Sequence, residues 1–206
     1  PDGVDTVVLE ENIESKEQNS ITFNGLIKVG ANTRNSGEDV KKGEKLFTAG
    51  HKVRPQDLAL LIATGIVDVE VYARLKVGIL STGNELLDTG SVYPYRMKKG
   101  KIFDSNRPML SSLLQSWGFD VFDFGIIRDE IELLREKLNE ANSEVDVIIL
   151  SGGASSGDED HVSALVKAEG KLENWRIAIK PGRPLALGFW NETPIFGLPG
   201  NPVAAF

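Results

Sequence analysis

A loop of small residues, Ser151-Gly-Gly-Ala-Ser-Ser-Gly157, follows an apolar stretch at 147–150 and leads directly into three acids at 158–160. Glycines allow backbone N–H groups to come close to an anion, because no Cβ stands in the way. Carboxylates beside such a loop supply the oxygen ligands that Mg²⁺ prefers. This stretch therefore predicts a site that binds a phosphate group together with a magnesium ion.

The same loop also has a simpler interpretation. A tight turn between a strand and a helix favours glycine, and an acid at the start of a helix is a common cap. The loop lacks the Gly-Lys-Ser/Thr ending of a Walker A loop, and it does not fit G-x-G-x-x-G. Taken alone, the loop leaves both interpretations open, and the rest of the chain has to distinguish them.

The other predicted strands also end in polar or turn-forming residues. Because the carboxyl ends of parallel strands lie at one edge of a sheet, we expect these residues to converge with the loop at 151–160. Strand by strand along the chain, they are Thr82, Gly83 and Glu85, then Asp129, then Lys180 and Arg183, and finally Pro199 and Pro202.

Carboxylates and cations at one sheet edge would suit a metal and an oxyanion. Lys180 offers a point charge and Arg183 a planar fork for such an anion. Each residue also has an ordinary explanation, since Asp129 would cap the next helix, Glu85 would be a solvated loop acid and Lys180 a surface lysine. Their recurrence at successive strand ends favours a site. No Ser-His-Asp arrangement is present, so we expect positioning and electrostatics rather than a covalent intermediate.

Apolar patterning beyond residue 74 predicts an α/β fold, a three-layer sandwich with a mainly parallel sheet. One helix would bury Met109, Leu110, Leu113, Leu114 and Trp117 on a single face and stop at Gly118. The predicted strands lie at 77–81, 119–127, 145–150, 175–179, 184–190 and 193–196, and the predicted helices begin near residues 104, 129 and 161.

Residues 1–73 predict a small mixed β/α module that precedes the domain at 74–206. A strand is expected at 6–9, short strands between glycine turns at 21–53, and another strand at 66–71. Pro55 and Gly65 mark the start and the stop of a helix. This module carries no chemistry of its own that we can identify.

Composition narrows the class of protein. The chain has 206 residues and a formal net charge of −7, which disfavours general nucleic-acid binding. It has no cysteine, which excludes disulfides and thiolate chemistry, and His51 and His161 lack metal-ligand spacing. No apolar run approaches the ~20 residues that span a bilayer, and no signal peptide is recognisable. We expect a soluble, cytoplasmic protein without a membrane partner.

Several motifs, taken in order, resemble a known family. The set resembles the molybdopterin molybdenumtransferases, namely the bacterial MoeA proteins and the gephyrin E domain, over nearly the whole chain. The opening residues 1–8, Gly37-Glu-Asp39 and Ala49-Gly50 are similar to the preceding domain of that family. The motifs are Ser81-Thr-Gly-Asn-Glu-Leu86, Asp104-Ser-Asn106, Gly125-Ile-Ile-Arg-Asp129, Ser151 to Gly157, Asp160, Ile179-Lys-Pro-Gly-Arg-Pro184 and Gly197-Leu-Pro-Gly-Asn-Pro-Val203.

The resemblance implies a magnesium-dependent enzyme that inserts molybdenum from molybdate into adenylylated molybdopterin and releases AMP. It implies metal roles for Glu85, Asp129 and Asp160, and catalytic roles for Asp129, Asp160, Lys180 and Arg183. It also implies a homodimer, with a molybdopterin adenylyltransferase as a further partner. Residues expected to bind the substrate are Thr82, Gly83, Ser151, Gly152, Gly153, Ser155, Gly157, Asp158, Pro199 and Pro202.

The sequence departs from the family pattern in places. Ala204 stands where a serine is common, and Arg183 replaces a frequent lysine. An upstream part and a C-terminal β domain are expected to be missing, so we interpret the chain as a fragment, and whether it is active on its own stays open. Two alternatives stay open: an enzyme resembling molybdopterin adenylyltransferase, and a gephyrin-like scaffold that binds a partner protein.

Overall fold

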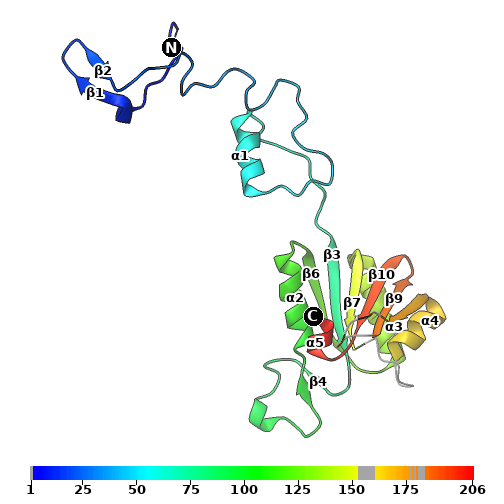
Figure 1. The fold of residues 1–206 in the computed structure, drawn as a ribbon. Coiled ribbons are helices and arrows are strands. Elements are labelled where there is room, and N and C mark those ends of the chain that lie inside the picture. The colour runs from blue at the N-terminus through cyan, green and yellow to red at the C-terminus, as the bar shows by residue number, and fades with distance from the viewer. Residues whose placement is uncertain (1, 153–160, 177, 179, 181–183) are drawn as a thin grey trace. The chain divides into compact units, whose positions relative to one another are not determined.

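The computed structural model describes residues 2–152, 161–176, 178, 180 and 184–206. It contains two compact units, Pro1–Val71 and Tyr72–Phe206 (Figure 1). In the part of the chain that the structure describes, no helix is both long and apolar enough to cross a bilayer.

The larger unit is built on a six-stranded sheet with the order β6-β3-β7-β10-β9-β8. β6, β3, β7 and β10 are parallel, while β9 is antiparallel to both β10 and β8. β8 consequently runs in the same direction as the four parallel strands. The strands are β3 (Lys76–Thr82), β6 (Asp120–Ile127), β7 (Val147–Ser151), β8 (Lys171–Arg176), β9 (Pro184–Trp190) and β10 (Thr193–Leu198).

Helices cover both faces of this sheet. α2 (Asn106–Ser116) packs Leu114 against Val77 and Ile79 on one face, while α3 (Ile131–Glu144) and α4 (His161–Glu169) cover the other (Figure 1). Leu80, which lies between Ile79 and Ser81 on β3, joins the second core because successive side chains of a strand point to opposite faces. The three-layer α/β sandwich with a mainly parallel sheet is confirmed.

Most predicted elements of this unit match the observed ones, with two corrections to helix ends. Trp117 is 59% exposed, because it follows the last turn of α2, whose buried side chains include Leu110 and Leu114. The predicted cap of α3 by Asp129 is wrong: the N-cap position belongs to Glu130, and Asp129 bonds to another loop. The strand expected at 175–179 begins earlier, at Lys171.

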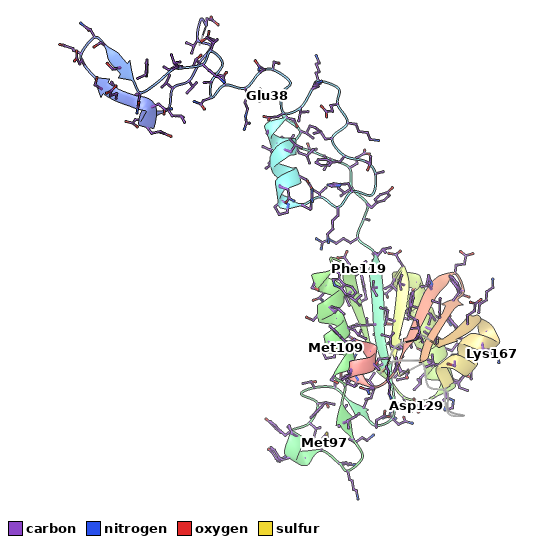
Figure 2. All side chains as sticks on the ribbon, viewed as in Figure 1. Glu38, Met97, Met109, Phe119, Asp129 and Lys167 are labelled. Carbon is purple, nitrogen blue, oxygen red and sulfur yellow. The ribbon has the colours of Figure 1, made fainter. Side chains whose placement is uncertain are left out.

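A long connection separates β3 from α2. Residues 86–103, called the excursion below, contain β4 (Leu86–Leu87), a 3₁₀ turn η2 (Pro94–Arg96) and β5 (Ile102–Phe103). β4 and β5 pair with each other in parallel, so the excursion leaves the main sheet and returns beside its own start. Met97, labelled in Figure 2, lies in its outer part. At the end of the chain, α5 (Pro202–Ala205) is capped by the Asn201 side chain, which accepts from the Val203 N–H.

The smaller unit is less regular than its sequence predicts. It contains a 3₁₀ turn η1 (Glu10–Asn12), an antiparallel hairpin of β1 (Ile13–Lys16) and β2 (Ile21–Phe23), and helix α1 (Pro55–Ala63). The strands predicted at 6–9, between the glycine turns after residue 23, and at 66–71 are wrong. β-branched residues favour a strand only where a neighbouring strand accepts its hydrogen bonds, and Val67 and Val71 instead stand exposed.

Candidate binding cleft

A cleft of about 820 Å³ opens at the carboxyl ends of β6, β3, β7 and β10. Its lining comes from the loops that follow these strands, from the excursion, and from the first residues of α2, α4 and α5. The lining residues are Thr82, Gly83, Asn84, Glu85, Leu86, Ile102, Phe103, Asp104, Ser105, Asn106, Asp129, Ser151, Gly152, His161, Gly200 and Pro202.

Sheet topology explains the position of this cleft. The chain leaves β3 for β6 on one side, through α2, and then crosses to β7 on the other side, through α3. The helices that follow β3 and β7, α2 and α4, therefore pack on opposite faces of the sheet, and the cleft lies at the ends of these two strands. Ligands of open α/β sheets bind at such switch points.

The loop after β3 brings a carboxylate into the cleft. Gly83 has φ +151°, and its N–H donates to Ile127 O at 3.2 Å, which fixes the loop against β6. A Cβ at Gly83 would stand 2.7 Å from Glu85 Oε2, so the Glu85 side chain folds back over the glycine. Glycine is favoured here because residues with a side chain rarely adopt this φ, and a side chain would also displace the flexible Glu85 carboxylate.

The loops after β3 and β6 are joined by a reciprocal pair of hydrogen bonds. Asp129 Oδ2 accepts from the Asn84 N–H at 3.0 Å, and the Asp129 N–H donates to Asn84 Oδ1 at 3.4 Å. These contacts replace the helix cap predicted for Asp129. They place its carboxylate in the same cleft as that of Glu85. Figure 2 shows Asp129 beside the start of the excursion.

The end of β7 packs tightly against the end of β3. Gly152 has φ +97°, and a Cβ there would lie 2.7 Å from the carbonyl oxygen of Thr82. Its N–H donates to Leu198 O at 3.0 Å, on the opposite side. Glycine at 152 is therefore required by the packing of two protein loops, a reason that is independent of any bound anion.

Asn106, the first residue of α2, ties three segments together. Its Nδ2 donates to Ser151 Oγ at 2.6 Å and to Gly200 O at 2.9 Å, which connects α2 to the ends of β7 and β10. Because a carbonyl oxygen only accepts, the contact with Gly200 fixes which amide atom is the nitrogen. Asn106 Oδ1 and Ser81 Oγ are buried and have no partner among the described residues.

An unmet buried acceptor costs about 1–3 kcal/mol. Within the described part of the chain, Asn106 Oδ1 at the cleft floor thus lacks a hydrogen-bond donor, and a ligand that brings a donor would fit this chemistry.

The structure brings together only part of the predicted site. Pro199 and the exposed Lys180 are not among the cleft residues. β8, which precedes Lys180, lies four strand positions from β3, or roughly 19 Å at the usual strand spacing. Gly153, Ser155, Gly157, Asp158, Asp160 and Arg183 lie outside the described residues. The predicted residues found in the cleft are Thr82, Gly83, Glu85, Asp129, Ser151, Gly152 and Pro202.

Several cleft residues were missed as site residues from the sequence. Asn84 and Asn106 are two of them, although the motif Asp104-Ser-Asn106 at the start of a helix was a usable signal. His161, whose spacing in the sequence does not indicate a metal ligand, also lines the cleft, at the start of α4. The hydrophobic wall from Leu86, Ile102 and Phe103 carried no local signal, because it depends on how the excursion folds back.

The carboxylates of the cleft fit a hard cation. Within the described ranges, no group of three or more His, Asp and Glu side chains is arranged to hold a metal ion. Glu85 and Asp129 do share the cleft, and Mg²⁺ commonly takes one or two carboxylates, completing its shell with water and substrate phosphate. The donor set is therefore compatible with magnesium.

Comparison with known proteins gives a consistent match for both units. Residues 78–206 match the family described as a probable molybdopterin binding domain, and residues 1–65 match the MoeA N-terminal region, domains I and II. Over its full length, the chain is 40% identical to a molybdopterin molybdenumtransferase from Haemophilus influenzae, and the match covers 50% of that enzyme. It is 35% identical, again over its full length, to the enzyme of that name from Bacillus subtilis, of which the match covers 48%.

A solved structure supports the same relationship. The crystal structure of a molybdopterin biosynthesis MoeA protein from Pyrococcus horikosii matches 98% of this chain and 49% of its own length, with a TM-score of 0.73 and 31% identity. The chain thus spans about half the length of the curated relatives it matches.

Proposed function

The chain belongs to the molybdopterin molybdenumtransferase (MoeA) family, and from this premise we propose that its cleft binds adenylylated molybdopterin. In this proposal the full-length protein inserts molybdenum from molybdate into the dithiolene and releases AMP. Residues 74–206 carry the site, and residues 1–73 belong to the flanking N-terminal region.

One observation carries the proposal. The cleft brings the carboxylates of Glu85 and Asp129 together with the Ser151–Gly152 turn, at the switch point of a parallel sheet. A nucleotide-bearing substrate needs a metal beside its phosphates and backbone groups that approach them closely. A volume of about 820 Å³ is within the range of small-molecule sites.

Each group has a defined role in this proposal. Magnesium, held by Glu85, Asp129 and Asp160, would neutralise charge on the phosphoanhydride. Asn106 would accept a hydrogen bond from the bound substrate, and Lys180 and Arg183 would hold the molybdate oxyanion. Contacts to the pterin and its phosphate are assigned to Thr82, Gly83, Ser151, Gly152, Gly153, Ser155, Gly157, Asp158, Pro199 and Pro202.

We also infer that the full-length protein is a homodimer and receives its substrate from a molybdopterin adenylyltransferase. The dimer is supported by exposed apolar side chains of the smaller unit, among them Leu26, Val29, Val67 and Val71. Light scattering of the full-length protein tests the dimer. The match of residues 1–65 to the MoeA N-terminal region favours this function over an adenylyltransferase reading of the chain itself.

Calorimetric titration with AMP and molybdate, with and without Mg²⁺, tests the proposed site. We expect AMP binding that requires magnesium, both in this chain and in the full-length protein. A folded full-length protein that binds no AMP in either condition would remove the proposed function.

Charge-matched variants sharpen this test. Glu85→Gln and Asp160→Ala should abolish the magnesium-dependent part of AMP binding and leave the unfolding midpoint unchanged. Glu136→Gln removes the same charge from an exposed position of α3 that does not line the cleft, and is expected to bind like the wild type. Equal loss in all three variants would indicate a general charge effect instead of a metal role.

A further inference from the structure

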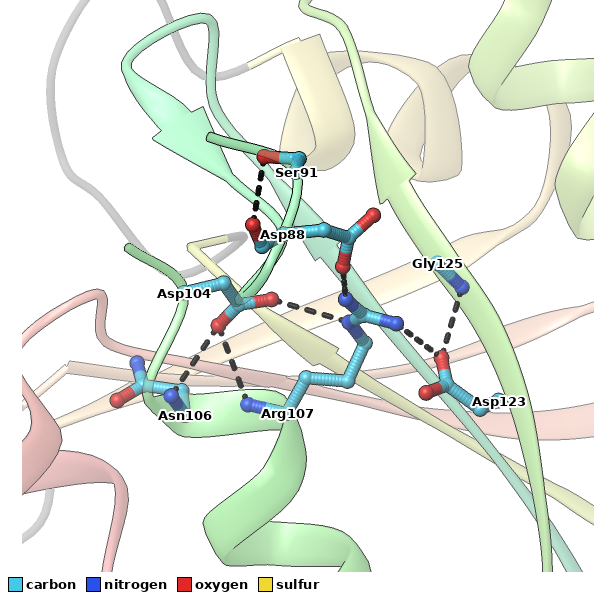
Figure 3. Close-up of polar contacts among 7 residues, drawn as sticks. All are labelled: Asp88, Ser91, Asp104, Asn106, Arg107, Asp123 and Gly125. Carbon is cyan, nitrogen blue, oxygen red and sulfur yellow. Dashed lines mark hydrogen bonds and ion pairs between the residues drawn. The ribbon is translucent and has the colours of Figure 1, made fainter. Parts of the chain in front are cut away.

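One arginine holds three carboxylates that come from three different segments. Arg107, in the first turn of α2, contacts Asp88 of the excursion, Asp104 just before the helix, and Asp123 of β6 (Figure 3). Its Nε lies 3.0 Å from Asp104 Oδ2, and its Nη1 lies 2.6 Å from Asp123 Oδ1. The second terminal nitrogen contacts Asp88 Oδ1.

The guanidinium is well suited to this arrangement. Its side chain is 11% exposed, and that of Asp104 is 2% exposed, so this pair is largely removed from water. Burial by itself would lower the pKa of Arg107, but the hydrogen bonds to Asp123 and Asp104 raise it above its ordinary value. Arginine stays charged and presents its donors in a fixed fork, whereas lysine offers a single point charge.

Apart from Arg107, the excursion is tied to the rest of the larger unit by the short ladder of β4 and β5 and by a hydrogen bond from Lys101 Nζ to Asn84 O. Its strands β4 and β5 contain two residues each, and their ladder continues through Ile102 N–H to Glu85 O at 3.0 Å and Asp104 N–H to Leu87 O at 2.9 Å. Its Tyr93 and Tyr95 side chains stack on each other and stand exposed. Segments with few buried contacts open locally at low cost.

Asp88 is the residue of the excursion that forms an ion pair with Arg107. It directly follows β4, and the Ser91 hydroxyl donates to Asp88 O at 2.6 Å, which closes a turn there (Figure 3). Leu86, Ile102 and Phe103, on the two short strands beside this turn, form a wall of the cleft. The contact between Asp88 and Arg107 therefore connects that wall to α2 and β6.

We propose that Arg107 is a positioning residue, a latch that holds the excursion against α2 and β6 and so fixes one wall of the cleft. Asp104, which is 2% exposed, orients the guanidinium, and Asp88 is the part of the latch that can release. The effect on ligand binding rests on the proposed function of the cleft, whereas the latch itself does not depend on it.

Two single substitutions separate release from general loss of charge. Asp88→Asn removes the charge on the excursion, while Asp123→Asn removes the same charge on β6. Asp88 and Asp123 are similarly exposed, at 57% and 51%, so neither change should unfold the domain. After Asp123→Asn, Arg107 still holds Asp88 and Asp104, and the excursion stays closed.

Amide hydrogen exchange of Ile102 and Asp104 measures the latch directly. We expect Asp88→Asn to accelerate exchange at both amides about tenfold, because a charge-assisted hydrogen bond is lost. Asp123→Asn should leave these rates unchanged, and Asp88→Glu, which keeps the charge, should restore most of the protection. Equal rates in the two Asn variants, or no change in either, would overturn the proposal.

A titration with AMP and Mg²⁺ then links the latch to the cleft. We expect weaker binding in Asp88→Asn and wild-type binding in Asp123→Asn, with the same unfolding midpoint for both. Wild-type protein that binds no AMP would count against the proposed function. The exchange rates would still show whether the contact between Arg107 and Asp88 holds the excursion. Wild-type binding in Asp88→Asn, combined with faster exchange, would refute the link to the cleft wall.

Discussion

Asn84 and Asp129 hold each other's backbone amides, 45 positions apart in the chain. This relationship gives one carboxylate two duties. Oδ2 of Asp129 bonds to the Asn84 N–H at 3.0 Å, while Oδ1 accepts no hydrogen bond from the described residues. The first oxygen fixes the loop after β3, and in the proposed function the second would contact the magnesium ion.

Substitution of Asp129 should separate these duties. Asp129→Asn keeps an oxygen acceptor for Asn84 but loses the charge, so we expect near wild-type stability and no magnesium-dependent AMP binding. Asp129→Ala removes the acceptor as well, and should also cost about 1 kcal/mol of unfolding free energy. Urea denaturation and calorimetry measure the two effects. Undiminished binding by Asp129→Asn would exclude a metal role for this residue.

Gly152→Ala should be strongly destabilising. Alanine at this position would have to keep the left-handed backbone conformation, and its methyl group would lie 2.7 Å from the Thr82 carbonyl oxygen. We therefore expect the free energy of unfolding to fall by about 3 kcal/mol or more. Gly118→Ala is the matched control, since Gly118 has a similar φ of +89° and open space around its Cβ. That variant should lose only about 1 kcal/mol. Equal losses would show that the contact with Thr82 does not matter.

Acid should weaken the start of α1. Hydrogen bonds from the Arg54 guanidinium at 2.9 and 3.0 Å hold the pKa of Asp57 well below its ordinary value of 3.8, and His51 Nε2 adds a contact at 2.8 Å. A lowered folded-state pKa means that the stabilisation is complete above pH 3.8 and disappears as the pH falls below it.

The stability difference between wild type and Asp57→Asn should therefore shrink as the pH falls below about 4. Hydrogen exchange of the α1 amides at several pH values measures it. The exposed pair of Arg34 and Asp39 supplies the control, because Asp39→Asn removes a carboxylate that water already screens. A difference that grows as the pH falls would contradict this account.

Lys180→Ala should weaken the binding of molybdate to the full-length protein. Because Lys180 is exposed, its attraction to an anion is screened by salt. The loss of molybdate affinity should therefore be larger at roughly 20 mM NaCl than at roughly 200 mM NaCl. Lys167→Ala, on the exposed side of α4, is the control and should bind normally. Equal losses for both lysines would leave only a general charge effect.

Local patterns in the sequence determined the elements of the larger unit. Apolar runs such as Val77–Leu80 and Ile148–Leu150 form buried strands in a sheet, because neighbouring strands pair their backbone groups while the helices cover their apolar side chains. The alternation of these runs with amphipathic helices indicates a parallel sheet. Thr82, Gly83, Ser151 and Gly152 could be assigned to one edge for the same reason.

Residue propensities were misleading where the predicted element had no neighbour to pack or pair with. Residues 66–71 are rich in valine, yet no described strand pairs with them, and Trp117 lies just past the buried face of its helix. Both cases depend on neighbours that a local window of sequence does not contain.

Tertiary structure decided which residues meet. Strand order placed β3 between β6 and β7 and put β8 at the far edge, so Asp129 came to Asn84 while Lys180 stayed outside the cleft lining. Asn106 bonds to Gly200 across 94 positions, and Arg107 gathers carboxylates from three segments. Such contacts follow from the packing of whole elements, which fixes the separation of distant side chains, whereas periodicity and turn residues encode only the elements themselves.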